Sequence, residues 1–275
     1  MNGEPVISGG TSALPAEYLQ RFGGVGRLLG QEALPQLLAS HVCVLGIGGV
    51  GSWVVEALAR SGVGAMTLVD ADDVCVTNTN RQLPALADTV GRPKVGVMAE
   101  RVAMISPSCR VEATAEFYTR ANADALFAQG FDFIVDCVDR AATKAHIVHS
   151  CRERGIPVLT CGAAGGRRDP ASVRASDLGF AGNDELLRAV RRTLRCDHGW
   201  PVGQRGAGKP MGVPCVFSSE KPVFPRMDGT CSAEPEPGGS LRMDCASGFG
   251  AVTFVTGVFG FVVAGEVVKR LLARE

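Results

Sequence analysis

The sequence is short of aromatic residues and carries no net charge. Only 6% of the 275 residues are aromatic, and 28 lysine and arginine residues are balanced by 28 aspartate and glutamate residues. A chain without an overall positive field binds nucleic acid only through a local basic patch, so binding by the whole surface is excluded. The hydrophobic content of 46% provides the apolar area that a folded core needs and excludes a disordered chain.

Zinc-binding and secretory patterns are also missing. No two of the ten cysteines are separated by two residues, so the chain has no Cys-x-x-Cys pair and we expect no structural zinc. Several cysteines, Cys43 among them, lie in apolar runs, which is typical of core thiols in a reducing compartment. Residues 1–16 lack the basic and apolar regions of a secretory signal. We therefore expect a cytoplasmic protein.

One long stretch near the C-terminus, residues 248–265, contains no charged residue. Its length reaches that of a membrane span. However, it contains five glycines and two threonines, and it is rich in valine rather than leucine. An all-apolar helix fits a protein core as well as a membrane. We expect a buried core or interface helix, and membrane association is the disfavoured alternative.

Apolar runs and helical patterns alternate along the first 160 residues. Short apolar runs are typical of buried strands, and longer amphipathic segments between them are typical of helices. This alternation predicts an α/β fold, Rossmann-like, in which a mainly parallel, twisted sheet carries helices on both faces, followed by an extended C-terminal part. The expected strands are 42–45, 66–69, 131–135 and 157–160, and the expected helices are 14–38, 52–61, 94–105, 143–154 and 184–195.

A glycine-rich turn follows the first expected strand. Gly46, Gly48, Gly49 and Gly51 fit the pattern G-x-G-x-x-G between a strand and a helix. Such glycines let the backbone approach a ligand closely, and the helix N-terminus offers N–H groups to phosphate. Asp70 ends the next strand, where a carboxylate can bind ribose hydroxyls. The pattern predicts a nucleotide site but does not separate NAD from ATP.

Charged residues beyond the glycine turn favour ATP. A hydride-transfer enzyme has little need for cations and spare carboxylates around a phosphate chain. An enzyme that cleaves ATP needs them to balance developing charge and to hold a metal ion. The residues in question are Asp72, Asn78, Arg81 and Lys94, together with Asp136 and Asp139 at the end of another expected strand.

Five segments in this order resemble the ThiF/MoeB/ubiquitin-activating superfamily of adenylating enzymes. They are GIGGVG (46–51), LVDADDV (68–74), NTNRQ (78–82), GRPK (91–94) and DCVD (136–139). The resemblance implies ATP and Mg²⁺ as cofactors, and a homodimer in which an arginine near the N-terminus enters the partner subunit's site. It assigns the four glycines to the turn over the nucleotide, Asp70 to the ribose, Asn78, Arg81 and Lys94 to the phosphates and the transition state, Asp139 to Mg²⁺ and Arg27 to the partner's site. Asp72 either contacts the nucleotide or holds the following loop.

Further segments narrow the resemblance to the tRNA threonylcarbamoyladenosine dehydratase family. They are RFGGVGRLLG (21–30), CVFSSE (215–220) and RMDCASGFGA (242–251). This similarity implies ATP-dependent cyclisation of N6-threonylcarbamoyladenosine beside the anticodon of tRNA, through adenylation of the threonine carboxylate. It leaves open a bound monovalent cation. On this interpretation, residues 1–162 form the ATP-binding half, and residues 163–275 of the same domain carry the substrate loops and the dimerisation part.

Basic residues in the second half are candidate tRNA contacts. Arginines of the expected helix 184–195 lie on one face, and a solvated helix face is the alternative interpretation. The candidate substrate-binding residues are Arg167, Arg168, Arg188, Arg192, Arg195 and Lys209.

Cys231, in an expected loop, is a candidate reactive thiol, because relatives implied by the resemblance transfer sulfur. A cysteine desulfurase or a sulfur acceptor would then be a partner. Three alternative functions remain: an adenylating activator of a ubiquitin-like sulfur carrier protein, an NAD-dependent oxidoreductase and a non-enzymatic sulfur-relay scaffold. The missing Cys-x-x-Cys pairs argue against the first, and the NTNRQ segment with Lys94 argues against the second.

Overall fold

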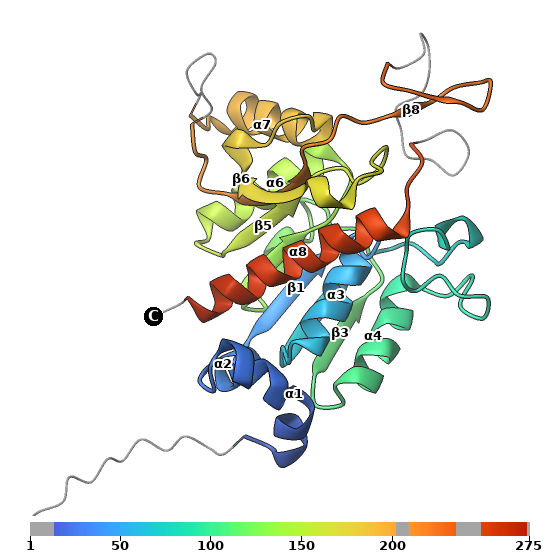
Figure 1. Ribbon diagram of the computed structural model, residues 1–275. Helices are drawn as coiled ribbons and strands as arrows, with labels where there is room; N and C mark the ends of the chain where they lie inside the picture. The colour runs from blue at the N-terminus through green and yellow to red at the C-terminus, as the bar shows by residue number, and fades with distance from the viewer. Residues whose placement is uncertain (1–13, 202–208, 235–248, 274–275) are drawn as a thin grey trace, which may run out of the picture.

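A seven-stranded sheet lies between two layers of helices (Figure 1). The structure is a computed structural model and describes residues 14–201, 209–234 and 249–273. The strand order is β3-β2-β1-β4-β5-β7-β6, and only β6 runs antiparallel to its neighbour within this described sheet. The predicted fold class, a Rossmann-like and mainly parallel sheet with helices on both faces, is confirmed.

The strands and helices have the following bounds. The sheet contains β1 (His41–Leu45), β2 (Ala65–Val69), β3 (Arg110–Thr114), β4 (Phe133–Asp136), β5 (Val158–Cys161), β6 (Val173–Asp177) and β7 (Pro214–Ser218), and a separate ribbon contains β8 (Phe224–Pro225) and β9 (Cys231–Ser232). The helices are α1 (Ala16–Leu29), α2 (Ala33–Ala39), α3 (Gly51–Arg60), α4 (Lys94–Ile105), α5 (Ala123–Phe127), α6 (Ala141–Glu153), α7 (Glu185–His198) and α8 (Thr253–Leu272), with short 3₁₀ turns at Val76–Asn78, Pro170–Ser172 and Leu178–Phe180.

The two faces of the sheet are covered by different helices. Side chains alternate along β1, so that Val42 and Val44 join a core with α3, α4 and α8, whereas Cys43 and Leu45 join a core with α5 and α6. Helix α7 packs beside α6 on this second face. Burial of both faces explains why the central strands are continuous apolar runs rather than alternating patterns.

Two expectations about helices need correction. The segment 14–38 is not one helix, because the chain breaks between α1 and α2 at Gly30, which adopts a positive φ of 97°. The apolar stretch 248–265 contributes to α8, which begins only at Thr253 and ends beyond the stretch at Leu272. Helix α8 lies across α3 and the sheet (Figure 1), as expected for a core helix. Within the described ranges, no helix is both long and apolar enough to cross a membrane.

Several elements were not expected from the sequence. They include β3, α5, β6 and β7, of which β6 and β7 extend the sheet beyond residue 162. Most of the segment 242–251, on which part of the resemblance rests, lies outside the described residues.

Candidate active site

The order of the strands reverses between β1 and β4. From β1 the chain proceeds outward through β2 and β3, and it then returns to place β4 on the other side of β1. In open parallel sheets, ligands bind beside the carboxyl ends of the strands at such a reversal. Here the carboxyl ends of β1 and β4 are hydrogen-bonded to each other, since the backbone N–H of Cys137 donates to the carbonyl of Leu45 over 2.8 Å. The glycine turn therefore lies at the expected ligand crevice.

Gly46 and Gly51 are required by the packing of the glycine turn itself. Gly46 has a φ of 89°, and a Cβ atom there would lie 2.9 Å from the carbonyl carbon and oxygen of Cys137. A Cβ atom on Gly51 would lie 1.8 Å from the carbonyl oxygen of Gly46. These two glycines thus allow β1, the turn and the segment after β4 to meet.

We expect Gly51→Ala to destabilise the protein by at least about 2 kcal/mol, because the added methyl group overlaps backbone that cannot move aside. Urea denaturation followed by circular dichroism measures this loss. Gly96→Ala is the matched control, since Gly96 lies inside α4 and a Cβ atom there meets no described atom within 4 Å. Equal stability of the two variants would contradict the packing argument.

Gly48 leaves bare backbone at the crevice. Among the described residues, a Cβ atom on Gly48 would meet only Nε2 of Gln82, at 3.9 Å. Gln82 is 8% exposed, and its Oε1 atom has no hydrogen-bond partner in the part of the chain that the structure describes. An unpartnered buried amide beside bare backbone fits a site that a polar ligand completes. Gln82 belongs to the NTNRQ segment, but we assigned it no role from the sequence.

Asp70 holds the glycine turn in place. One carboxylate oxygen accepts from the N–H of Ile47 over 2.6 Å, and the other accepts from the N–H of Asp72 over 2.9 Å. Burial raises the pKa of Asp70, while the two backbone hydrogen bonds and the charge of Lys94 act in the opposite direction. Asp70 lies directly after β2, where the sequence placed the ribose ligand.

Asp72 and Lys94 form an ion pair beside Asp70, after the carboxyl end of β2. Their Oδ2 and Nζ atoms are 2.8 Å apart, and the N–H of Lys94 donates to the carbonyl of Asp72 over 3.1 Å. Lys94 is buried and lies at the start of α4, whereas the side chain of Asp72 is half exposed. Of the two roles considered for Asp72, these contacts match the structural one.

Asn78 and Arg81 lie in the turn after β2. Asn78 is buried and accepts from the N–H of Cys75 over 3.1 Å, so it fixes the shape of the turn. The guanidinium of Arg81 donates to the carbonyl of Thr77 and to Asn80, whereas its own carbonyl accepts from side chains of α3 and α8. The backbone of this turn is therefore fixed by two helices, and within the described residues the arginine side chain makes its hydrogen bonds to neighbours in the same turn.

The two carboxylates at and after the end of β4 have different environments. Asp136 is fully buried and contacts Lys144, whereas Asp139 is exposed. Of these two carboxylates, Asp139 is thus the one that solvent can reach. Among the described residues, no group of three or more histidine, cysteine, aspartate or glutamate side chains is arranged to hold a metal ion.

Arg27 lies on α1, at the amino ends of the strands, whereas the glycine turn lies at their carboxyl ends. On α1, the Tyr18 hydroxyl donates to the carbonyl of Gly62, which precedes β2, and Arg21 donates to the carbonyl of Ile105 at the end of α4. These contacts place α1 at the amino ends of the strands, as Figure 1 also shows. A five-residue strand is about 17 Å long, so Arg27 and the glycine turn of the same chain are far apart.

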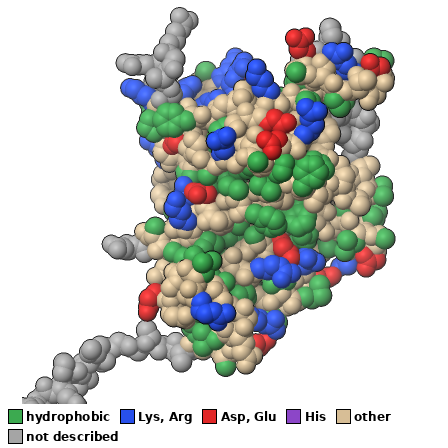
Figure 2. Space-filling view, in the orientation of Figure 1, with side chains coloured by type: hydrophobic (Ala, Val, Ile, Leu, Met, Phe, Trp, Pro, Cys, Tyr) green, Lys and Arg blue, Asp and Glu red, His purple; other side chains and the backbone are tan. Residues whose placement is uncertain are grey.

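Helix α7 carries exposed arginines. Its buried face consists of Leu187, Val190 and Leu194, so the remaining faces are free for charged residues. Figure 2 shows Lys and Arg side chains gathered over this helix at the top of the molecule. Arg192 is exposed, Arg188 is exposed and paired with Glu185, and Arg195 is half buried.

Of the remaining basic candidates, Arg167 does not lie on the surface. It is 3% exposed, and its guanidinium donates to the carbonyls of Glu220 and Asn183, so it connects three loops. Arg168 and Lys209 are exposed. Cys231 was expected in a loop. It is exposed and is the first residue of the two-residue strand β9, which pairs with β8.

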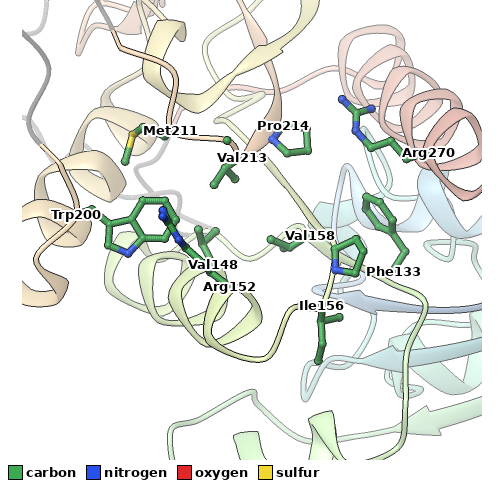
Figure 3. A pocket seen from close by; sticks show the side chains of 12 residues that line it. Phe133, Val148, Arg152, Ile156, Val158, Trp200, Met211, Val213, Pro214 and Arg270 are labelled. Carbon is green, nitrogen blue, oxygen red and sulfur yellow. The ribbon is translucent and has the colours of Figure 1, made fainter. Parts of the chain in front are cut away.

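A cavity of about 430 Å³ lies away from this site. It is lined by Phe133, Val158 and Pro214, which are the first residues of β4, β5 and β7, and Figure 3 shows it between Arg270 and the Arg152–Trp200 pair. The guanidinium carbon of Arg152 is 4.2 Å from the centre of the Trp200 ring. Because this cavity is at the amino ends of the strands, it is separate from the crevice described above.

Comparison with known proteins agrees with this geometry. Residues 24–275 match the ThiF family. The chain belongs to the ThiF family. A tRNA threonylcarbamoyladenosine dehydratase of Escherichia coli (strain K12) is 48% identical to this ThiF family member over 258 residues, which cover 94% of this chain and 95% of the relative. Crystal structures of E. coli TcdA, a dehydratase of the same name, in complex with ATP and with AMP each superpose with a TM-score of 0.83 at 42% identity, covering 95% of this chain and 97% of theirs.

Proposed function

We propose that this ThiF family protein is an ATP-dependent tRNA threonylcarbamoyladenosine dehydratase. The observation that carries the proposal is the similarity to proteins of that name along nearly the whole chain. The glycine turn at the strand reversal and the cations beside it supply the chemistry that such an activity needs. The sulfur-carrier alternative is not favoured, because the relatives matched over nearly the full length are named dehydratases.

The proposed reaction activates a carboxylate. An oxygen of the threonine carboxylate in the modified nucleoside attacks the α-phosphorus of ATP, and pyrophosphate leaves. An internal nucleophile of the same modified nucleoside then attacks the activated carbonyl carbon, and AMP leaves with the carboxylate oxygen. The net change in the nucleoside is the loss of one water. The enzyme contributes positioning and neutralisation of developing negative charge.

Binding of a nucleoside triphosphate is supported by the bare backbone at Gly48, which adjoins Gln82, whose Oε1 atom has no hydrogen-bond partner among the described residues. Asp70 would bind the ribose, Lys94 would bind the phosphates, and Arg81 would donate to the negative charge that develops on them in the transition state, with Asn78 fixing the turn between them. Asp139 would hold Mg²⁺, which offsets phosphate charge when bound with ATP. A tRNA substrate agrees with the cytoplasmic location expected from the sequence.

A homodimer would bring Arg27 to a second copy's crevice. The apolar side chains of Leu28 on α1 and of Phe254 and Phe261 on α8 are 82%, 56% and 51% exposed. A depression of about 550 Å³ between the two helices is lined by apolar residues such as Leu29, and Figure 2 shows a hydrophobic band across this face. Exposed patches of this kind mark interaction surfaces. Self-association through this face would cover it.

Helix α7 would contact the tRNA backbone. We expect Arg192→Glu to weaken tRNA binding about tenfold at low salt and to reduce the salt dependence of binding, because a phosphate contact is replaced by a repelling charge. Filter binding at several salt concentrations measures both effects. Arg110→Glu on the edge strand β3 makes the same charge change far from α7. Equal weakening by the two variants would show that only net charge matters.

The direct test of the proposed function uses the full chain with ATP, Mg²⁺ and tRNA that carries threonylcarbamoyladenosine. Mass spectrometry of the nucleosides should show the loss of one water, dependent on ATP. An unchanged nucleoside in the presence of bound ATP would refute the proposal.

A further inference from the structure

Lys144 is a fully buried lysine whose ammonium donates to the end of β4 and to the residues that follow it. The residue lies in α6 and is 0% exposed. Its Nζ atom is 3.1 Å from Oδ2 of Asp136 and donates to the carbonyl of Asp136 over 3.1 Å and to the carbonyl of Val138 over 2.9 Å. An ammonium has three donors, and all three have partners in this one segment.

Asp136 is satisfied by the same arrangement. Its carboxylate also accepts from the Thr160 hydroxyl over 2.7 Å and from the N–H of Val138 over 3.2 Å. The ion pair therefore fixes both ends of a three-residue turn, 136–138. Burying such a pair seldom stabilises a protein more than apolar residues of similar volume would. Stability alone is thus a weak reason for this chain to bury a lysine here.

The segment that Lys144 holds is one wall of the nucleotide crevice. The carbonyl group of Cys137 limits the space at Gly46 to less than a Cβ atom requires, and its N–H is bonded to the end of β1. The carbonyl of Val138, which Lys144 binds, belongs to the peptide group that leads directly into Asp139. Movement of that peptide group would move the exposed carboxylate of Asp139.

The charge state of Lys144 is consistent with this role. Burial alone would lower the pKa of Lys144, but the neighbouring Asp136 carboxylate and the Cys161 and Cys137 sulfurs raise it above its ordinary value. This shift favours the ammonium form, which is the form that has three donors.

We propose that Lys144 is a positioning residue for nucleotide activation, which fixes the 136–138 turn so that Asp139 is directed at the metal-bound phosphates. This inference rests on the proposed function, in which Asp139 holds Mg²⁺. The ammonium itself does not reach the crevice, because its donors are used inside the fold.

The test compares three variants of the full chain. Lys144→Met leaves the Asp136 carboxylate buried without its cation, so it should lower both the melting temperature and the reaction rate. The double variant Asp136→Asn/Lys144→Met removes both charges and should recover much of the melting temperature. The control Arg101→Met breaks a different ion pair, with Glu56, between α3 and α4.

The decisive readout is the Mg²⁺ concentration that gives half the maximal rate of ATP-dependent dehydration. We expect this concentration to rise at least about tenfold and the maximal rate to fall about 10- to 100-fold in the double variant, as for other residues that orient a metal ligand. Arg101→Met should leave both unchanged. A double variant with wild-type Mg²⁺ dependence would overturn the inference and leave Lys144 a stability element. Failure of the proposed function is distinct, since the wild-type protein would then not dehydrate the nucleoside.

Discussion

Replacement of Arg81 with alanine should leave ATP binding within a few-fold of wild type and lower the rate of dehydration by about 10²–10³, the cost of removing one donor to developing charge. The fold should survive because the interactions that tie this turn to α3 and α8 use the carbonyl of Arg81, with Trp53 and Thr256 as donors. Alanine keeps that carbonyl. In the part of the chain that the structure describes, the side chain contributes two hydrogen bonds, to its neighbours Thr77 and Asn80.

Calorimetry with a non-hydrolysable ATP analogue and single-turnover nucleoside analysis measure the two quantities separately. Arg92→Ala is the matched control, since Arg92 is a nearby arginine that pairs with Glu100 on the surface of α4. It should retain wild-type binding and rate. An Arg81→Ala protein that turns over at the wild-type rate would remove Arg81 from the site. Loss of ATP binding with an unchanged maximal rate would give it a role in binding alone.

The parts of the fold that the sequence predicts well are those with one strong local cause. The strands around 42–45 and 66–69 are buried on both faces, so their apolar runs stand out from the chain. The boundaries of α4 agree with the expectation at both ends, because Pro93 precedes the helix and Pro107 follows it. The glycine turn was recognisable since its spacing reflects backbone contacts at Gly46 and Gly51.

The elements that were missed lack such a cause. Strand β6, Val173–Asp177, lies at the sheet edge and contains three polar or charged residues, so neither alternation nor an apolar run marks it. Strand β3 lies at the other edge and is largely exposed. Edge strands are specified by the partner strand that they pair with, and that pairing is not local in sequence. The break at Gly30 was missed because apolar residues continue on both sides of it.

The side-chain partners at the site could not be predicted from the sequence for a similar reason. The spacing of Asp136 and Asp139 places both after one strand, but only the structure shows that Lys144, on the following helix, neutralises the first. Arg167 was a candidate tRNA contact from the sequence, yet its guanidinium donates to carbonyls of two loops that are distant in sequence. Burial of a charged side chain depends on such tertiary contacts, which composition does not reveal.

A mixture of two inactive variants should regain activity if Arg27 acts across a dimer. Arg27→Ala and Arg81→Ala each remove one cation from the proposed site, so each protein alone should be at least about 10²-fold slower than wild type. Within one chain, Arg27 lies at the amino ends of the strands and Arg81 lies near the glycine turn at their carboxyl ends. One chain alone therefore does not bring the two arginines together. In a mixed dimer, one crevice receives Arg81 from one copy and Arg27 from the other, and it is complete.

Equal amounts of the two variants, exchanged by mild denaturation and refolding, should therefore recover about a quarter of the wild-type activity, since half of the dimers are mixed and each has one complete site. Single-turnover dehydration measures the recovery. A mixture of Arg27→Ala with the double variant Arg27→Ala/Arg81→Ala is the control and should stay inactive, because every crevice then lacks Arg27. Recovery in that control, or full activity of Arg27→Ala alone, would show that Arg27 contributes nothing in trans. A mixture that forms dimers but stays inactive would show that the two arginines do not share a site.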